Sequence, residues 1–203
     1  MFVVLEGIDG AGCGAQRKAL EKRGKIGNKP IFTLKYPHYK DDLGKTIHRF
    51  LHRKLNLSVY SQFLLYSLQM VAEREKIASL RKKGILISDR YFTSTLAYQG
   101  TFGFPLQKAL EFARMFQIEV PDLVIFLDVR PETAFGRKLK EEGKEELDQN
   151  ESNLSLIRKV DSMYRKFIEN QVFSRWIKVN GERPIEEVTG KIVEIIKRKL
   201  GEG

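Results

Sequence analysis

The sequence predicts an α/β fold built on a doubly wound parallel sheet. Apolar, β-prone runs alternate along the chain with segments of helical character, as in strands joined by crossover helices. A glycine-rich turn follows the first run directly, and two later runs end in charged residues. Ligands of such sheets bind beyond the carboxyl ends of the strands, so these turns are the candidate functional positions.

The strand and helix candidates can be placed in chain order. The first strand candidate is apolar throughout, as a buried parallel strand should be. The third helical segment is long and partly apolar. Strands are predicted at residues 1–5, 30–35, 84–88, 122–128 and 175–179. Helices are predicted at residues 16–23, 43–50, 58–82, 106–116 and 186–200.

The composition fits a globular protein with a real core. The 203 residues are 42% apolar and 31% charged, which excludes disordered and fibrous classes. No stretch reaches the ~18–20 apolar residues of a membrane span, and no signal peptide is visible, so we expect a cytoplasmic location. The net charge of +10 is scattered along helices without a nucleic-acid motif. We therefore expect a polyphosphate substrate rather than a nucleic-acid partner.

The turn after the first strand is a phosphate-binding loop without its lysine. The P-loop pattern is Gly, four residues, then Gly-Lys-Ser/Thr, but Cys13 and Gly14 stand at the lysine and hydroxyl positions. Backbone amides and the helix N-terminus can hold phosphate without a side chain. We expect the helix to point Arg17 and Lys18 away from the phosphates. The predicted phosphate-binding residues are Gly7, Gly10, Ala11, Gly12, Cys13, Gly14 and Ala15.

Two further segments suggest functional roles. Asp89 and Arg90 directly follow the third strand, where a carboxylate can order Mg²⁺ and a guanidinium can clamp phosphate; a structural ion pair is the alternative. Residues 138–150 are the most charged and least apolar stretch. Because no repeat or linker interrupts the chain, we expect one domain over residues 1–203 with a lid at about residues 138–151.

These motifs resemble the thymidylate kinase family of P-loop nucleoside monophosphate kinases, from residue 1 to about residue 200. Four stretches carry the likeness: Leu5 to Gly12, Tyr36-Pro37-His38-Tyr39, Asp89-Arg90-Tyr91 with Ser94, and Ala97-Tyr98-Gln99-Gly100. The resemblance implies a P-loop NTPase-type three-layer α/β/α fold with a five-stranded parallel sheet and a short lid. It also implies phosphoryl transfer from ATP, with Mg²⁺, to dTMP by a homodimer.

The resemblance also implies roles for individual residues. Asp9 would receive the 3′-hydroxyl of the acceptor, Arg90 its phosphate, and Asp89 would hold Mg²⁺. Arg137 would pack near the adenine of ATP, and Lys144 in the lid would stabilise the transferring phosphoryl group. Tyr98 would pack beneath the sugar and exclude a 2′-hydroxyl. The other predicted substrate-binding residues are Tyr36, Tyr39, Tyr66, Met70, Arg74, Thr95 and Gln99.

Two departures from the family pattern leave alternatives open. Cys13 cannot replace the lysine, whose loss would cost about 10²- to 10³-fold in rate, and a thiolate there would repel phosphate. Met70 stands where relatives have an arginine that reads thymine, with Arg74 one helical turn away as a candidate replacement. The chain is expected to be a thymidylate kinase with a lid cation, a kinase of another nucleoside monophosphate, or a catalytically silent nucleotide-binding relative.

Overall fold

The computed structural model describes residues 1–140 and 153–201. In this part of the chain, six strands form one sheet in the order β2-β3-β4-β1-β5-β6. All neighbours are parallel except β2 and β3. The strands are β1 (Phe2–Glu6), β2 (Lys25–Ile26), β3 (Lys29–Lys35), β4 (Ile85–Asp89), β5 (Leu123–Asp128) and β6 (Trp176–Asn180).

The α/β prediction is confirmed, and each predicted strand has its counterpart within one or two residues. The five parallel strands β3, β4, β1, β5 and β6 form the expected sheet. The sequence did not predict β2, a two-residue antiparallel addition at the edge. In register, Val4 lies between Ser88 and Val124, so β1 is the middle of the parallel sheet.

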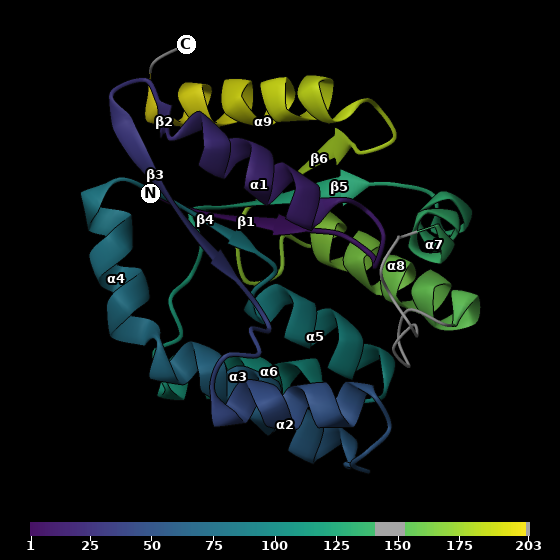
Figure 1. Cartoon of the computed structure of the whole chain (residues 1–203). Coiled ribbons are helices and arrows are strands. Elements are labelled where there is room, and N and C mark those ends of the chain that lie inside the picture. The colour runs from purple at the N-terminus through teal and green to yellow at the C-terminus, as the bar shows by residue number, and fades with distance from the viewer. Residues whose placement is uncertain (141–152, 202–203) are drawn as a thin grey trace.

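Helices cover both faces of the sheet (Figure 1). On one face α1 and α9 pack together, and on the other α5 packs against α8 and α3. No helix within the described ranges is long and apolar enough to span a bilayer. The helices are α1 (Cys13–Arg23), α2 (Asp42–Leu51), α3 (Val59–Ala72), α4 (Arg74–Lys83), α5 (Phe92–Thr101), α6 (Leu106–Met115), α7 (Pro131–Leu139), α8 (Leu154–Glu169) and α9 (Ile185–Leu200).

The hydrophobic core is built around the sheet, and polar residues stand at the carboxyl ends of its central strands. Every residue of β1 and β4 is buried, as expected for strands covered on both faces. These strands end in Glu6 and Asp89, so two carboxylates stand at the same carboxyl edge. The chain turns there into α1 and α5, which places both turns beside each other.

The long helix predicted at residues 58–82 is wrong, because the structure has two helices separated at Glu73. The Glu73 carboxylate accepts a hydrogen bond from the phenol of Tyr36 over 2.5 Å. The chain changes direction at this contact, and α4 then packs against β4 with Ile77 fully buried. Neither glycine nor proline marks the break in the sequence.

A second, smaller hydrophobic cluster lies apart from the central core. It is built on Ile47, Phe50 and Leu51 of α2. Partly buried side chains of the following loop and of α3 pack against it: Leu55, Leu57, Leu65 and Tyr66. The cluster therefore fixes α2 to α3 and not directly to the sheet.

Candidate active site

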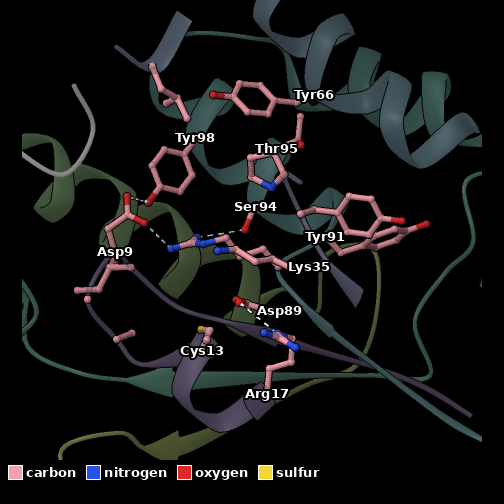
Figure 2. A pocket seen from close by; sticks show the side chains of 18 of the residues that line it. Asp9, Cys13, Arg17, Lys35, Tyr66, Asp89, Tyr91, Ser94, Thr95 and Tyr98 are labelled. Carbon is pink, nitrogen blue, oxygen red and sulfur yellow. Dashed lines mark hydrogen bonds and ion pairs between the residues drawn. The ribbon is translucent and has the colours of Figure 1, made fainter. Parts of the chain in front are cut away.

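A cleft of about 1250 Å³ opens at the carboxyl edge of the sheet. This volume exceeds the ~300–1,000 Å³ that usually holds one small ligand, so two ligands of nucleotide size fit the space. Figure 2 shows the side chains of Asp9 and Tyr98 meeting in it, with Cys13, Arg17 and Asp89 grouped below. The predicted site residues in its lining are Asp9, Gly10, Ala11, Gly12, Cys13, Gly14, Ala15, Tyr36, Tyr39, Tyr66, Met70, Asp89, Arg90, Thr95, Tyr98, Gln99 and Arg137.

The turn between β1 and α1 has the form of an anion-binding loop. Gly10 and Gly12 have φ values of +88° and +101°, which favour glycine. A Cβ on Gly10 would lie 2.1 Å from the backbone oxygen of Ala134, so α7 packs directly on the loop. Helix α1 begins at Cys13, and the amides of its first turn have no partner within the helix. They therefore offer donors to a phosphate at the cleft wall.

Gly7 does not line the cleft, contrary to the prediction that it binds phosphate. It lies behind the loop, where a Cβ would be 2.6 Å from Cβ of Ala11 and 3.3 Å from the backbone oxygen of Leu127. The lack of a side chain at Gly7 is thus needed for the loop to close against β5. Gly7 therefore shapes the loop, and the cleft is lined by the loop residues from Ile8 onward.

Asp9, Arg90 and Tyr98 form one hydrogen-bonded cluster. Arg90 donates from Nη2 to Oδ1 of Asp9 over 2.6 Å, and Tyr98 donates its phenolic proton to Oδ2 over 2.6 Å. The Asp9 and Arg90 side chains are only 18% and 16% exposed, so water screens their charges weakly. Arg90 also has φ of +64°, in the left-handed region that non-glycine residues rarely adopt. This strained backbone turns the guanidinium into the cleft beside Asp9.

The carboxylate of Glu6 supports this cluster from below. It is fully buried, and burial raises its pKa, while hydrogen bonds from Ser94, Thr93 and Tyr164 act in the opposite direction. Ser94 donates to Glu6 over 2.6 Å and in turn accepts from Arg90 over 3.3 Å. Glu6 was not among the predicted site residues, although a carboxylate at the end of an apolar strand was a usable signal.

Asp89 is the carboxylate nearest the P-loop at the end of β4. Burial raises its pKa, and the positive charges of Arg90, Lys35 and Arg17 partly offset this effect. A Cβ on Gly14 would lie 3.4 Å from Oδ2 of Asp89, so the glycine leaves space beside the carboxylate. Among the described residues no three His, Cys, Asp or Glu side chains form a metal-binding group. One carboxylate beside a phosphate site nevertheless fits Mg²⁺, which proteins often hold through one or two carboxylates and substrate phosphates.

The Cys13 thiol is buried at the base of the loop. Burial raises its pKa well above the ordinary value, and the negative charge of Asp89 adds to this effect. The side chain is therefore a neutral thiol at physiological pH. The expected repulsion between a thiolate and phosphate is absent, but so is any cation at this position.

Several cations differ from their predicted positions. Arg17 and Lys18, expected to point away, both line the cleft, and so does Lys35, which the sequence did not single out. Arg74 does not line it: the residue belongs to α4 and donates from Nη1 to the side chain of Gln117 over 2.6 Å. The predicted base contact of Arg74 is thus wrong, because the break at Glu73 moves it off α3.

The predicted lid is only partly within the described residues. Lys144 and residues 141–151 lie outside them. At its start, Arg137 lines the cleft and donates from both Nη atoms to the backbone oxygen of Gly181 over 3.2 Å. The guanidinium is therefore held at the end of α7, next to the P-loop.

The helical wall of the cleft combines aromatic, apolar and polar side chains. Tyr66 and the buried Met70 project from α3, and Thr95 and Gln99 come from α5. Gln99 is 3% exposed, and its Oε1 accepts no hydrogen bond within the described ranges. A buried amide oxygen without a partner is costly, so this atom is suited to receive a ligand N–H.

Comparisons with known proteins agree with this geometry. The family model for thymidylate kinase matches residues 5–192. The probable thymidylate kinase of Thermococcus kodakarensis is 31% identical over the full length of both chains. The thymidylate kinase of Chlorobium luteolum is 30% identical over 100% of this chain and 99% of its own, and that of a Bacillus cereus strain is 27% identical over 98% of each. The resemblance inferred from the four motifs is confirmed: this chain belongs to the thymidylate kinase family.

Proposed function

We propose that this protein transfers the γ-phosphoryl group of ATP to dTMP, giving ADP and dTDP. The observation that carries the proposal is the Asp9–Arg90–Tyr98 cluster, which joins the P-loop residue Asp9 to the guanidinium of Arg90 within one cleft. An anion-binding loop on one side and a buried guanidinium on the other are suited to two phosphorylated ligands. Family membership and the names of the relatives support the same assignment.

On the donor side, the amides of residues 9–15 would hold the phosphates of ATP, and Arg137 would pack near the adenine. Asp89 would hold Mg²⁺, which when bound neutralises charge on the phosphates. The cleft residues would align the two phosphates and keep water away from them. No general base is needed, because the attacking atom is an anionic phosphate oxygen.

On the acceptor side, Arg90 would clamp the phosphate of dTMP while Asp9 holds the guanidinium and receives the 3′-hydroxyl. Tyr98 would lie beneath the sugar, and Tyr36, Tyr39 and Thr95 would complete the pocket. Of these residues, Tyr36 is anchored by its hydrogen bond to Glu73. Fixed partners of this kind allow the acceptor to be positioned without rearranging the site.

For recognition of the base, Gln99 supplies a polar contact in place of the arginine that relatives have at the position of Met70. Its buried Oε1, which lacks a partner among the described residues, can accept the ring N3–H of thymine. Cytosine has an acceptor at the same ring position, so Gln99 would disfavour it. Tyr66 and Met70 would pack on the ring faces. This arrangement supports a thymine or uracil base despite Met70.

We also propose a homodimer with a cytoplasmic location, as the family resemblance implies. On α3, Tyr60, Leu64 and Leu68 are 49%, 54% and 45% exposed and follow one another at four-residue spacing. Such a stripe lies on one face of a helix and is suited to a second copy of the chain. Leu64→Glu should produce monomers, and sedimentation equilibrium of both proteins measures this.

The test is ADP release by purified protein from ATP and Mg²⁺ against dTMP, dUMP, UMP, CMP, AMP and GMP. A clear preference for dTMP supports the proposal. Preference for another acceptor would make the protein a different nucleoside monophosphate kinase. Absence of turnover with all six, while ATP and dTMP still bind in calorimetry, would identify a catalytically silent relative.

A further inference from the structure

We propose that Arg17 supplies the donor-phosphate cation that the P-loop lacks at Cys13. The inference rests on the proposed function, since it assigns a phosphate contact within the same cleft. Arg17 lies one helical turn after Cys13 on α1, and its side chain is 17% exposed and lines the cleft. Helical side chains lean toward the N-terminus of their helix, so a long side chain at position 17 covers the turn that holds residues 13 and 14.

The guanidinium of Arg17 lies at the metal-binding carboxylate. Its Nε is 4.0 Å from Oδ2 of Asp89, and Figure 2 shows Arg17 directed at Asp89 beside Cys13. This Nε is buried and has no hydrogen-bond partner in residues 1–140 and 153–201. A buried charged donor without an acceptor is unfavourable, and a phosphate oxygen in the cleft would satisfy it.

Gly14 makes room for this arrangement. A Cβ at position 14 would stand 3.4 Å from Oδ2 of Asp89. Residues 14 and 17 are three apart on a helix and share a face, so Gly14 leaves the approach from Arg17 to Asp89 open. The missing hydroxyl at position 14 and the position of Arg17 are therefore compatible with each other.

The other contacts of Arg17 can be exchanged for phosphate. Its Nη1 donates to Glu21 over 2.7 Å and to the hydroxyl of Thr33 over 3.5 Å. Glu21 is 55% exposed, and ion pairs with such exposed partners are weak in water. Phosphate oxygens offer a guanidinium two parallel hydrogen bonds in a less hydrated place. The neighbouring Lys18 also lines the cleft, but its side chain is exposed and gains less from the exchange.

The experiment compares Arg17→Ala with Arg23→Ala, which removes the same charge from an exposed position on α1 outside the cleft lining. Calorimetry measures the affinity for ATP and for AMP, and steady-state assays measure turnover with dTMP. We expect Arg17→Ala to weaken ATP binding at least tenfold with AMP binding nearly unchanged. Turnover should fall about 10²-fold at constant KM for dTMP, while Arg23→Ala behaves as the unmodified protein. Arg17→Gln replaces Arg17→Ala if the alanine variant does not fold.

Two further variants separate a phosphate contact from a structural one. Glu21→Gln breaks the ion pair with Arg17 but leaves the guanidinium, so it should retain turnover within about threefold. The double variant with Cys13→Lys and Arg17→Ala should phosphorylate dTMP at least tenfold faster than Arg17→Ala alone. The inference is overturned if Arg17→Ala keeps ATP affinity and turnover within twofold, or if Glu21→Gln matches its losses. If the unmodified protein does not phosphorylate dTMP, the proposed function fails, and the ATP affinities of the Arg17 and Arg23 variants still decide the phosphate contact.

Discussion

Arg90 and Asp9 form an ion pair with 2.6 Å between Nη2 and Oδ1, although 81 positions separate them in the chain. The pair joins the turn after β1 to the segment after β4, at the point where the proposed donor and acceptor meet. Tyr98 holds the second carboxylate oxygen, so the orientation of Asp9 is set from two sides.

Arg90→Ala should abolish phosphoryl transfer and leave ATP binding within about threefold. The acceptor phosphate loses its clamp, and removal of one pre-organised charge typically costs at least about 10²- to 10³-fold in rate. Turnover with dTMP and calorimetry with ATP measure the two effects. Arg114→Ala on α6, exposed and outside the cleft lining, is the matched control. Loss of ATP binding in Arg90→Ala would contradict the role of Arg90 on the acceptor side.

Tyr98→Phe and Tyr98→Ala should separate the hydroxyl of this residue from its ring. Phe removes the hydrogen bond to Asp9 and should cost about 1 kcal/mol of stability, while the ring still crowds a 2′-hydroxyl. Ala removes the ring as well. The ratio of kcat/KM for dUMP to that for UMP should persist in Tyr98→Phe and collapse in Tyr98→Ala. An unchanged ratio in Tyr98→Ala would place sugar discrimination elsewhere.

Cys13 should resist alkylation in the native protein. Burial raises its pKa well above the ordinary value and shields the side chain, so the reactive thiolate is scarce near neutral pH. Since it is the single cysteine of the chain, the iodoacetamide reaction reports on this site alone. We expect labelling in urea to be at least about 100-fold faster than in buffer. Equal rates would show that the loop opens freely to solvent.

As the pH is lowered, kcat/KM for ATP should fall at a higher pH than it would if it depended on an aspartate of ordinary pKa. The Mg²⁺ site proposed at Asp89 requires the carboxylate form, and burial raises the pKa of this group, so protonation begins at a higher pH as the pH falls. Lys35 lowers the same pKa, so Lys35→Ala should move the acid midpoint of kcat/KM for ATP to still higher pH. Lys25→Ala, exposed on β2, should leave the midpoint in place. A shift to lower pH in Lys35→Ala would assign the acid limb to another group.

Gly10→Ala and Gly136→Ala should have opposite effects on stability. A Cβ on Gly10 would lie 2.1 Å from the backbone of Ala134, and its φ of +88° costs roughly another 1–2 kcal/mol for alanine. Gly136, inside α7, has no atom within 4 Å of the place a Cβ would occupy, and alanine there should stabilise the helix by about 0.5–1 kcal/mol. Thermal melting of both variants checks the signs. A harmless Gly10→Ala would mean that the loop and α7 are not in fixed contact.

The strands could be predicted from the sequence because each is a continuous apolar run ending in a turn or a charge. Helix α5 was missed because its sequence, Phe-Thr-Ser-Thr-Leu-Ala-Tyr-Gln-Gly-Thr, has no charged face and is rich in Thr, Ser, Gly and aromatic residues, which are weaker helix formers. The structure buries it between α3 and α8 and so overrides its weak propensity. Helices α7 and α8 flank the charged stretch and were missed as well.

Within the site, the positions of residues next to a motif were easier to predict than those of residues whose side-chain direction depends on tertiary structure. Asp9, Asp89 and Tyr98 follow strand ends or family motifs, and each lines the cleft. The position of Arg17 in the cleft could be predicted only by knowing how far its side chain leans toward the N-terminus of α1. The position of Arg74 depends on the break at Glu73, which lies at a contact with Tyr36 and has no glycine or proline to mark it in the sequence.

The separate cluster beneath α2 gives the two walls of the cleft different stabilities. The P-loop wall is continuous with the central sheet, so the amides of the buried strand β1 behind the loop exchange with solvent only when most of the core unfolds. Helix α2 rests on a few side chains of its own, and its amides can exchange through a local opening that leaves the sheet intact. A ligand in the cleft thus contacts one wall that is rigid and one, α2, that opens locally. Nucleotide binding should therefore slow amide hydrogen exchange most strongly in α2.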